Sequence, residues 1–288
     1  MLHIFKSRLA PHLAGLFLFM VLITGMAPLA QASHFRYGNI SWTPVASDPT
    51  GRTIQFRVSV GYRTSFGWGT AVVPGAVVTD GDSFRFGDGT STPLNFTVTS
   101  VNGPDDYFYA ESVITKTYTS NGNFTAFFSS CCRITLQNNG DDSFRVSTVV
   151  TVGNNNRAPV ATLSPIVNLA AGLSSATFQI PASDPDGDGI TYSLAGSGDL
   201  GSIIFTQPPG LSISGTGLLT FNTVGKANNQ LFNAIVKLTD ARGAVVFLDF
   251  IIRISGSGNP PTFVYGGDRK STRLNSSHST LSRMPSSA

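Results

Sequence analysis

Several residue types are scarce in this sequence, and each shortage excludes a class of protein. Its 288 residues include two cysteines, four histidines, five lysines and one glutamate. Two cysteines are too few for a disulfide-rich scaffold, and the shortage of lysine and glutamate removes residues that usually fill exposed helix faces. After the N-terminal segment, no apolar run approaches the ~20 residues of a membrane-spanning helix. Glycine, serine, threonine, valine and phenylalanine are abundant instead, which favours an all-β protein.

The positions of the histidines exclude most catalytic schemes. His3 and His12 lie in the N-terminal segment and His278 lies in the C-terminal tail, which leaves His34 for the folded region. A Ser-His-Asp or Cys-His arrangement would need its base at the very start of that region, and a zinc site built from several histidines is excluded. Glu111 is the one glutamate, and no aspartate pair lies in a recognisable catalytic motif. The sequence therefore predicts a protein that is not an enzyme.

The first 32 residues have the pattern of a secretory signal peptide. Lys6 and Arg8 precede an apolar stretch from Leu13 to Ile23, and Ala30–Ala32 is a small-x-small cleavage pattern. A retained membrane anchor is the alternative, but the apolar stretch is only about half of the ~20 residues that spanning requires. We therefore expect residues 1–32 to be removed and the mature protein to be secreted, extracellular or attached to the cell surface.

Residues 268–288 differ in composition from the rest of the chain. Asp268–His278 is basic and rich in serine, and it resembles the translation of a sequencing-library adaptor; a disordered basic tail is the alternative. We exclude this tail from the fold prediction and expect the natural protein to continue past Gly267. Between the two terminal segments, residues 33–267 carry 13 positive and 15 negative side chains, so the overall charge of +3 does not indicate a nucleic-acid partner.

Alternating apolar residues predict antiparallel strands in the folded region. From Ile54 to Tyr62 and from Val246 to Ile254 every second residue is apolar, which places one face on a core and the other in water. Leu211–Ile213 and Leu219–Phe221 flank the turn sequence Ser-Gly-Thr-Gly, as in a β-hairpin. Short strands separated by turn signals at this spacing are typical of β-sandwiches.

Two proline-containing linkers divide this region into units of sandwich size. Gly153–Pro159 is polar and ends with a proline that cannot continue a strand ladder, and a similar sequence recurs at Ser257–Pro261. The two linkers lie about 100 residues apart, which is one sandwich length. The predicted organisation is a tandem of antiparallel β-sandwiches at 33–153 and 154–256, followed by the start of a third module at 257–267.

The first predicted sandwich contains two motifs in a recognisable order. Phe84–Gly89 reads FRFGDG, and Thr117–Thr125 reads TYTSNGNFT. Together they resemble a PKD-type (polycystic-kidney-disease) Ig-like repeat, and Ser33–Gly38 looks like the start of secreted bacterial surface proteins. Within the first motif, we expect Asp88 to cap its own turn by accepting backbone N–H groups rather than to bind a ligand.

The second predicted sandwich carries a longer series of motifs. They read RAPV at Arg157–Val160, ASDPDGDG at Ala182–Gly189, PPGLSI at Pro208–Ile213 and VKLTDARG at Val236–Gly243. In this order they resemble a dystroglycan-type cadherin-like module, also described as an Ig domain of bacterial surface proteins. The resemblance implies a seven-stranded sandwich that serves as a spacer or adhesive unit, binds calcium and lies at the cell surface.

Asp184, Asp186 and Asp188 form the strongest candidate site. Three carboxylates at alternate positions in a glycine-containing turn offer the oxygen ligands that Ca²⁺ prefers, at ~2.4 Å. They repel one another unless a cation neutralises them, which favours calcium over the alternative, a polar turn whose aspartates bond their own backbone. An EF-hand is excluded because Ala195 occupies the twelfth loop position, where a bidentate glutamate belongs.

The cadherin-like resemblance adds three residues to this predicted calcium site. It implies that Asp240, in Thr-Asp-x-x-Gly, corresponds to a calcium ligand. It also implies that Asn155 and Asn156 supply oxygens from the linker, as the linkers between cadherin repeats do. Ca²⁺ is therefore the cofactor that we expect.

Cys131 and Cys132 are adjacent, and the predicted mature chain has no other cysteine. In a strand, successive side chains point to opposite faces, so a bond between these two closes an eight-membered ring. Two separate thiols are one interpretation. A vicinal disulfide is the other, since an exported chain meets oxidants outside the cytoplasm.

The sequence supports two functional hypotheses. The first is a non-enzymatic adhesion and spacer protein, secreted or at the cell surface, that binds calcium through its cadherin-like domain. The second is an accessory carbohydrate-binding segment of a larger secreted hydrolase. We expect cell-surface proteins or polysaccharide as partners, and membrane association only through a region beyond Gly267.

A group of aromatic residues in the first sandwich bears on the second hypothesis, because such rings can line a sugar-binding face. Their alternating positions favour packing in the core instead. The group consists of Tyr37, Trp42, Tyr62, Phe66 and Trp68.

Overall fold

The computed structural model describes residues 33–140, 142–201 and 204–256. The predicted signal peptide (1–32), the start of a third module (257–267) and the adaptor-like tail (268–288) lie outside the described residues. Within the described ranges, no helix has the length and apolar character needed to cross a membrane.

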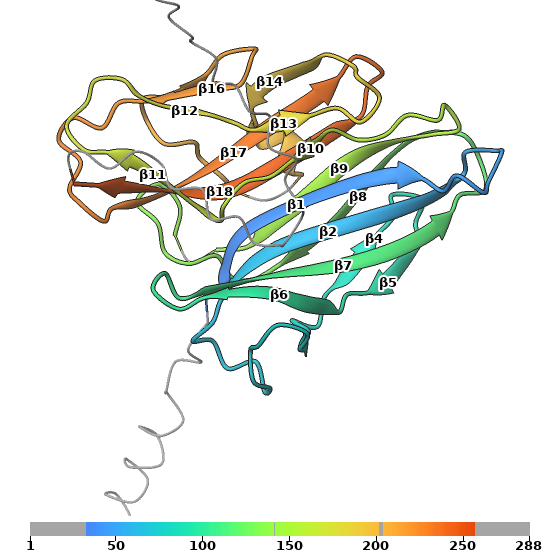
Figure 1. Cartoon of the computed structure of the whole chain (residues 1–288), viewed down its shortest axis with the longest axis horizontal. Coiled ribbons are helices and arrows are strands. Elements are labelled where there is room, and N and C mark those ends of the chain that lie inside the picture. The colour runs from blue at the N-terminus through green and yellow to red at the C-terminus, as the bar shows by residue number, and fades with distance from the viewer. Residues whose placement is uncertain (1–32, 141, 202–203, 257–288) are drawn as a thin grey trace, which may run out of the picture.

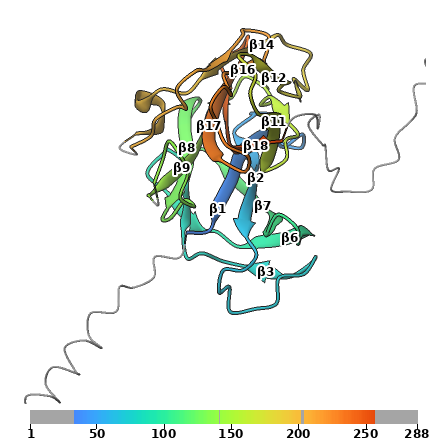
Figure 2. The same ribbon diagram turned by 90° about the vertical axis from the view of Figure 1, so that its left-hand side faces the viewer.

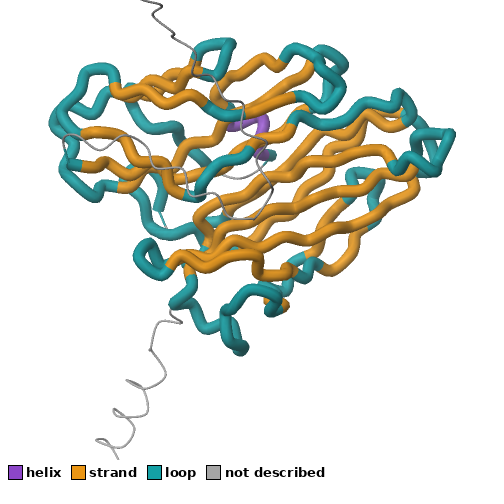
Figure 3. The backbone as a smooth tube through the Cα atoms, viewed as in Figure 1, coloured by secondary structure: helices purple, strands orange, loops and turns teal. Residues whose placement is uncertain are grey.

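Strands dominate both halves of the described chain (Figures 1 and 3). Those of the N-terminal half are β1 (Phe35–Pro44), β2 (Thr53–Arg63), β3 (Val77–Val78), β4 (Ser83–Arg85), β5 (Ser91–Pro93), β6 (Phe96–Asn102), β7 (Tyr107–Thr117), β8 (Gly122–Ser130) and β9 (Phe144–Val152). Those of the C-terminal half are β10 (Val160–Ala161), β11 (Ile166–Ala170), β12 (Ala176–Gln179), β13 (Ala182–Ser183), β14 (Ile190–Leu194), β15 (Leu211–Ile213), β16 (Leu218–Phe221), β17 (Leu231–Asp240) and β18 (Val245–Ser255). A short 3-10 helix, η1, spans Ser197–Leu200. The predicted all-β fold is confirmed.

The alternating segments form strands where the sequence predicted them. Residues 54–62 lie in β2, which pairs antiparallel with β7 along its whole length. Phe56, one of the inward-facing residues of β2, is fully buried, whereas its neighbour Arg57 is exposed. β15 and β16 form the predicted hairpin, with Ile213 opposite Leu219. Local period-2 patterning is therefore a sufficient signal for these strands.

The last strand of the C-terminal half joins the sheet of the N-terminal half. One edge of β18 pairs with β17 along most of its length. The opposite edge meets β9 at its start, β1 at Asp249 and, in parallel, β11 from Ile251 to Ser255. Figures 1 and 2 both show the orange-red β18 beside the blue β1. A sheet in the order β3-β6-β7-β2-β1-β18-β9-β8-β4-β5 therefore connects the two halves.

The expectation that one side of β18 faces water is wrong. On that side, Phe247 is 4% exposed and Ile251 is fully buried, because the N-terminal half covers them. Phe247 packs in a cluster with Val149 of β9, and Asp249 binds Arg133. A strand that is covered on both faces is apolar at both sets of alternate positions. In the sequence, the apolar residues Phe247 and Ile251 indicated that β18 is such a strand.

An apolar cluster extends through both halves. It includes Phe35, Phe56 and Phe128 from the N-terminal half and Phe221 and Phe250 from the C-terminal half, all fully buried. Burying one such side chain stabilises a fold by ~1.5–3 kcal/mol. Because the sheet and the cluster are both continuous, the two halves pack as one unit.

Candidate functional site

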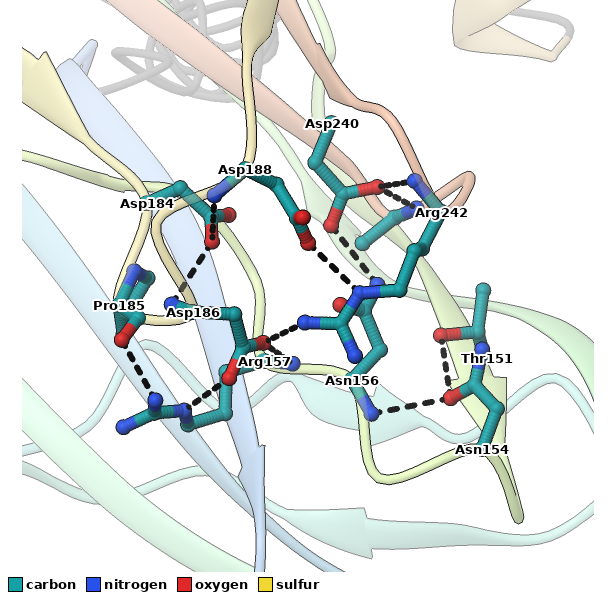
Figure 4. Close-up of polar contacts among 11 residues, drawn as sticks. Thr151, Asn154, Asn156, Arg157, Asp184, Pro185, Asp186, Asp188, Asp240 and Arg242 are labelled. Atoms are coloured by element: carbon teal, nitrogen blue, oxygen red, sulfur yellow. Dashed lines mark hydrogen bonds and ion pairs between the residues drawn. The ribbon is translucent and has the colours of Figure 1, made fainter.

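The loop between β13 and β14 carries the three aspartates that were predicted to bind calcium (Figure 4). Asp184 Oδ1 accepts the N–H of Asp186 at 2.8 Å and the N–H of Asp188 at 3.2 Å. Gly187, at φ +82°, donates its N–H to the Asp184 carbonyl at 3.1 Å, a turn that glycine adopts without steric penalty. The loop is thus a self-bonded polar turn, and it brings oxygens of the three carboxylates within 4.8 Å of one another.

Two arginines supply positive charge to this cluster. Arg157, from the linker before β10, places Nε 2.7 Å from Asp186 Oδ1 and donates its backbone N–H to Asp186 Oδ2 at 2.8 Å. Arg242, from the β17–β18 turn, places Nη2 2.5 Å from Asp186 Oδ2 and Nε 2.6 Å from Asp188 Oδ2. Figure 4 shows both guanidinium groups directed at the aspartates. Sequence reasoning missed these two arginines, although both stand inside the motifs RAPV and TDARG.

The arginines also set the protonation of the cluster. Burial alone would raise the pKa of Asp186, but hydrogen bonds from Arg157, together with the charges of Arg157 and Arg242, hold that pKa below its ordinary value. The hydrogen bond to Asp188 raises the pKa of Arg242. Both shifts favour the charged forms, so the cluster is a network of ion pairs at neutral pH.

Asp240 lies beyond Arg242 and closes the β17–β18 turn. Its Oδ1 accepts the N–H of Arg242 at 2.9 Å and that of Ala244 at 2.8 Å. Its Oδ2 accepts Nδ2 of Asn156 at 2.7 Å, and both residues are buried. The structure therefore brings Asn156 and Asp240 together, as the predicted site required. Asn155 is placed elsewhere, with its Oδ1 beside Gly51 in the turn between β1 and β2.

With both guanidinium groups in place, these residues do not fit a calcium ion. Ca²⁺ takes six to eight oxygens, whereas both oxygens of Asp186 and both of Asp240 already accept hydrogen bonds. Asp184 Oδ2 and Asn156 Oδ1 are buried oxygens without a hydrogen-bond partner, so these two buried oxygens at the edge of the cluster could still bind a metal ion. Calcium binding therefore stays a prediction, and it requires that Arg242 move away from Asp186 and Asp188.

A second polar cluster lies between the two halves. Arg133 donates from Nη1 to Asp249 Oδ1 at 2.8 Å and from Nη2 to Asp249 Oδ2 at 2.6 Å. Asn233 of β17 donates Nδ2 to the same Asp249 Oδ1 at 2.7 Å. Arg133 is 3% exposed, Asp249 1% and Asn233 0%, so this pair is shielded from water and joins the β8–β9 loop to β18.

The same loop continues along β17. The Gln137 N–H donates to the Leu231 carbonyl at 2.9 Å. Asn138 then exchanges two hydrogen bonds with the backbone of Asn233, at 2.9 Å each. Amide side chains here satisfy backbone groups of the opposite half, which fixes the position of the loop.

Two family models match this chain in tandem. The model of integrin beta-like protein A-E, N-terminal, matches residues 36–153, and the model of the second Ig-like domain of integrin beta-like protein A-E matches residues 160–260. The chain belongs to the integrin beta-like A–E family. Integrin beta-like protein A of Dictyostelium discoideum is 34% identical over 249 residues, which cover 81% of this chain and 12% of that protein. Integrin beta-like protein C of the same organism is 32% identical over 260 residues, which cover 83% of this chain and 12% of the relative.

Solved structures of tandem Ig modules are also similar to this chain, at lower sequence identity than these relatives. The tandem Ig repeats of Dlar align with a TM-score of 0.27 and 10% identity, over 72% of this chain and 91% of that chain. The two tandem V-type regions of a v-region-containing chitin binding protein align with a TM-score of 0.30 and 13% identity, over 79% and 90%. The tandem Ig-like architecture of this integrin beta-like chain is confirmed by its second family model. The PKD-type and cadherin-like assignments, a bacterial source and the predicted domain bounds stay predictions.

The aromatic residues of this integrin beta-like chain pack mainly in the core. Tyr37 and Tyr62 are fully buried and Trp42 is 3% exposed, so core packing is confirmed for these three. Phe66 and Trp68 are half-buried and contact the imidazole of His34, with ring centroids 4.6 Å and 5.3 Å away, and Trp68 also packs against the core. The histidine is therefore enclosed by aromatic rings.

An acidic pair lies beside this enclosed histidine. Asp80 Oδ2 is 3.9 Å from His34 Nε2 and accepts the Tyr62 hydroxyl at 2.6 Å. Burial raises the pKa of Asp82 to about 6, and the nearby Asp80 carboxylate adds to this effect. Asp82 Oδ2 is buried without a hydrogen-bond partner. We therefore expect Asp82 to be a pH-sensitive group in the N-terminal half.

Cys131 and Cys132 lie at the end of β8. The structure joins their sulfurs in a disulfide. The Cys132 carbonyl accepts the N–H groups of His34 and Phe35, at 2.9 Å and 3.2 Å, and thereby holds the start of β1. Cys131 is exposed and Cys132 is buried, so reagents would reach Cys131 first. The redox state in solution stays a prediction.

Proposed function

We propose that this segment is a non-catalytic adhesion and spacer module of a cell-surface protein, and that its two Ig-like domains act as one rigid unit. The observation that carries the proposal is the position of β18, which pairs with β17 on one edge and with β9, β1 and β11 on the other. A module built in this way keeps its two ends at a fixed separation and transmits force without bending at the linker.

The buried pair between Arg133 and Asp249 supports the rigidity of this unit. A separate pair of domains joined by a linker would present small, polar contacts and would move relative to each other. Here the contact contains a desolvated, two-point ion pair, and removing one partner of such a pair typically costs 3–5 kcal/mol. Separation of the halves would expose both charges and break the strand pairing at once.

The relatives support an adhesive role through their names alone. Both are called integrin beta-like proteins, and this chain spans 12% of the length of each. We propose an extracellular or cell-surface location, because the sequence predicts a signal peptide at residues 1–32. We propose cell-surface proteins or polysaccharide as partners. Calcium is not part of the proposed function, since Arg157 and Arg242 form ion pairs with Asp186 and Asp188.

An attachment assay tests the adhesive function. Beads coated with the secreted chain are presented to cells of the source organism, and attached beads are counted against beads coated with albumin. We expect more attachment to the chain, and we expect the soluble chain to compete for it. Attachment equal to that of albumin, with a chain that is folded by circular dichroism, would reject the adhesive role.

Small-angle X-ray scattering tests the rigidity separately. We expect the distance distribution of the chain to show one compact body, with the same maximum dimension at low and high salt. A distribution with two separated maxima, as two domains on a flexible linker produce, would reject the rigid unit while leaving adhesion open to the bead assay.

A further inference from the structure

An aromatic ring stands between two arginines on the outer face of β4, β8 and β9. Arg85 of β4 lies opposite Phe127 of β8 in the sheet register, and Phe127 lies opposite Ser147 of β9, two residues from Arg145. The Arg145 guanidinium carbon is 3.5 Å from the centroid of the Phe127 ring, and that of Arg85 is 5.5 Å away. Three side chains from three strands therefore form a basic, aromatic surface that we call the Arg85–Phe127–Arg145 cluster.

Neither arginine of this cluster is neutralised. None of the ion pairs within the described ranges includes Arg85 or Arg145. Asp88, three residues after Arg85, is bound instead by Lys116 at 2.8 Å and by Thr90. Arg145 Nε is also buried without a hydrogen-bond partner. Two guanidinium groups beside one ring repel each other, and an anion bound at Arg85 would reduce this repulsion.

The pKa of Arg145 reflects its burial and the nearby Arg85 guanidinium. Burial lowers the pKa of Arg145, and the charge of Arg85 lowers it further. Arginine stays protonated in proteins, so both side chains keep their positive charge.

A cavity of about 290 Å³ opens beside the cluster. Its walls are formed by Arg85, Gly87, Gly89, Thr90, Ser91 and Phe127. Gly87 has φ +84°, and a Cβ at this position would lie 2.6 Å from the Thr125 carbonyl oxygen, so the turn lies directly on β8 and fixes the cavity wall. The volume is at the lower end of ligand pockets, which suits one sugar ring or one side chain.

We infer that this cavity binds an acidic sugar unit of an extracellular polysaccharide, with the carboxylate or sulfate at Arg85, which lines the cavity, and with Arg145 beside Phe127 adding positive charge. Guanidinium groups form two parallel hydrogen bonds with such anions. The Phe127 side chain lines the cavity and offers an apolar contact for the sugar ring, and the Ser91 hydroxyl matches one of its hydroxyl groups. The Thr90 hydroxyl is already bonded to Asp88 and Lys116. A peptide would instead seek apolar side-chain pockets or an edge strand, and a cavity rimmed by glycines and hydroxyls offers neither.

The inference deepens the proposed adhesive function, because it names the ligand chemistry of one surface of the module. It depends on residues of the N-terminal half that the aspartate loop and the Arg133–Asp249 pair do not contact. Its failure and that of the adhesive function can therefore be separated by experiment.

Direct binding of defined polymers to the immobilised full chain tests the inference. Polygalacturonate provides carboxylates, dextran sulfate provides sulfates, neutral dextran provides uncharged sugar, and polyglutamate provides carboxylates without sugar. We expect one or both acidic polysaccharides to bind, neutral dextran not to bind, and affinity to fall as salt rises. Stronger binding of polyglutamate than of both acidic polysaccharides would overturn the sugar assignment in favour of an acidic peptide.

Matched variants locate the site. We expect the double variant Arg85→Gln/Arg145→Gln to weaken polysaccharide binding at least tenfold. The control Arg57→Gln removes one positive charge from β2, where Arg57 is exposed and pairs with Glu111, and should bind like wild type. Equal weakening by both changes would show a non-specific charge effect and overturn the site. Melting temperatures must match within ~2 °C; if the double variant melts lower, the single variant Arg85→Gln serves as a milder second variant, and unchanged binding would overturn the site.

Bead attachment with the same variants separates the two proposals. Loss of polysaccharide binding together with loss of attachment supports both. A double variant that loses polysaccharide binding but keeps attachment overturns the adhesive use of this cavity, while the adhesive function stands with another surface. If the wild-type chain binds polysaccharide but does not attach to cells, the adhesive function is overturned and the polysaccharide site is still supported.

Discussion

Arg133 and Asp249 face each other across the contact between the two Ig-like domains, with two parallel hydrogen bonds of 2.8 Å and 2.6 Å. They are 116 residues apart in the chain and nearly free of solvent. Asn233 adds a third donor to the Asp249 carboxylate. A buried pair of this kind favours this arrangement of the two domains, because a shifted packing that kept both groups buried would leave their charges unpaired.

Removing one partner of this pair should destabilise the whole chain. We expect Asp249→Leu to lower the free energy of unfolding by about 3–5 kcal/mol, since it leaves the Arg133 charge buried and unpaired. Urea unfolding measured by circular dichroism checks this. The double variant Arg133→Met/Asp249→Leu should recover part of the loss. The exposed control Arg57→Met should change stability by less than ~1 kcal/mol.

The continuous sheet predicts that both domains unfold in one transition. Trp42 and Trp68, the two tryptophans, both lie in the N-terminal half, so their fluorescence reports on that half, whereas far-ultraviolet circular dichroism reports on strands of both. We expect the two signals to have the same urea midpoint. Midpoints that differ by more than the fitting error would mean that the C-terminal half unfolds separately.

The strand alternation was predictable and the pairing of the last strand was not. β2 follows directly from period-2 patterning between Ile54 and Tyr62, because inside-outside alternation is a local property. The position of β18 between β1 and β17 depends on contacts with residues more than a hundred positions away. The sequence did contain a sign of this, since Phe247 and Ile251 are apolar on the face that a half-exposed strand would leave polar.

The aspartate cluster was likewise predictable in one respect and not in another. Its spacing correctly indicated that Asp184, Asp186 and Asp188 lie close together. The identity of the neutralising cation was not visible, because Arg157 and Arg242 come from a linker and a distant turn that only the folded chain brings to the loop. Repulsion between carboxylates indicates a positive partner, but it does not distinguish a metal ion from a guanidinium group.

Calcium titration distinguishes these two cations. With the arginines in place, we expect millimolar Ca²⁺ to leave the melting temperature of the wild-type chain unchanged within ~1 °C. The variant Arg157→Gln/Arg242→Gln leaves the aspartates without a counter-charge, so it should melt lower without Ca²⁺ and higher with it. A clear rise for the wild type, abolished in Asp186→Asn, would show that calcium displaces the arginines as the sequence predicted.

The cysteine pair is tested by alkylation without reductant. We expect mass spectrometry of the chain, purified without reductant, to find no label on Cys131 or Cys132, and two labels after reduction. The control is the same chain unfolded in guanidinium without reductant, which exposes the buried Cys132 thiol if it is free. Two labels in that control would mean separate thiols.

The half-buried acid pair near His34, Asp80 and Asp82, predicts a pH-dependent stability. Burial and the Asp80 carboxylate raise the pKa of Asp82 to about 6 in the folded chain, above its ordinary value of 3.8. Between these values the folded chain binds the proton that the unfolded chain has released. Ionisation of Asp82 therefore lowers the free energy of unfolding as pH rises from about 4 to about 6, and the loss persists above.

Replacing Asp82 with a neutral isostere should remove that loss. We expect Asp82→Asn to match the wild type at pH 4 and to melt about 2–4 °C higher at pH 7.5, the shift that ~1 kcal/mol produces in a chain of this size. The control Asp142→Asn changes an exposed carboxylate and should follow the wild-type profile at both pH values. A constant difference between Asp82→Asn and wild type across this range would mean that Asp82 does not take up its proton on folding, and that the surroundings of His34 are not the pH-sensitive part of the molecule.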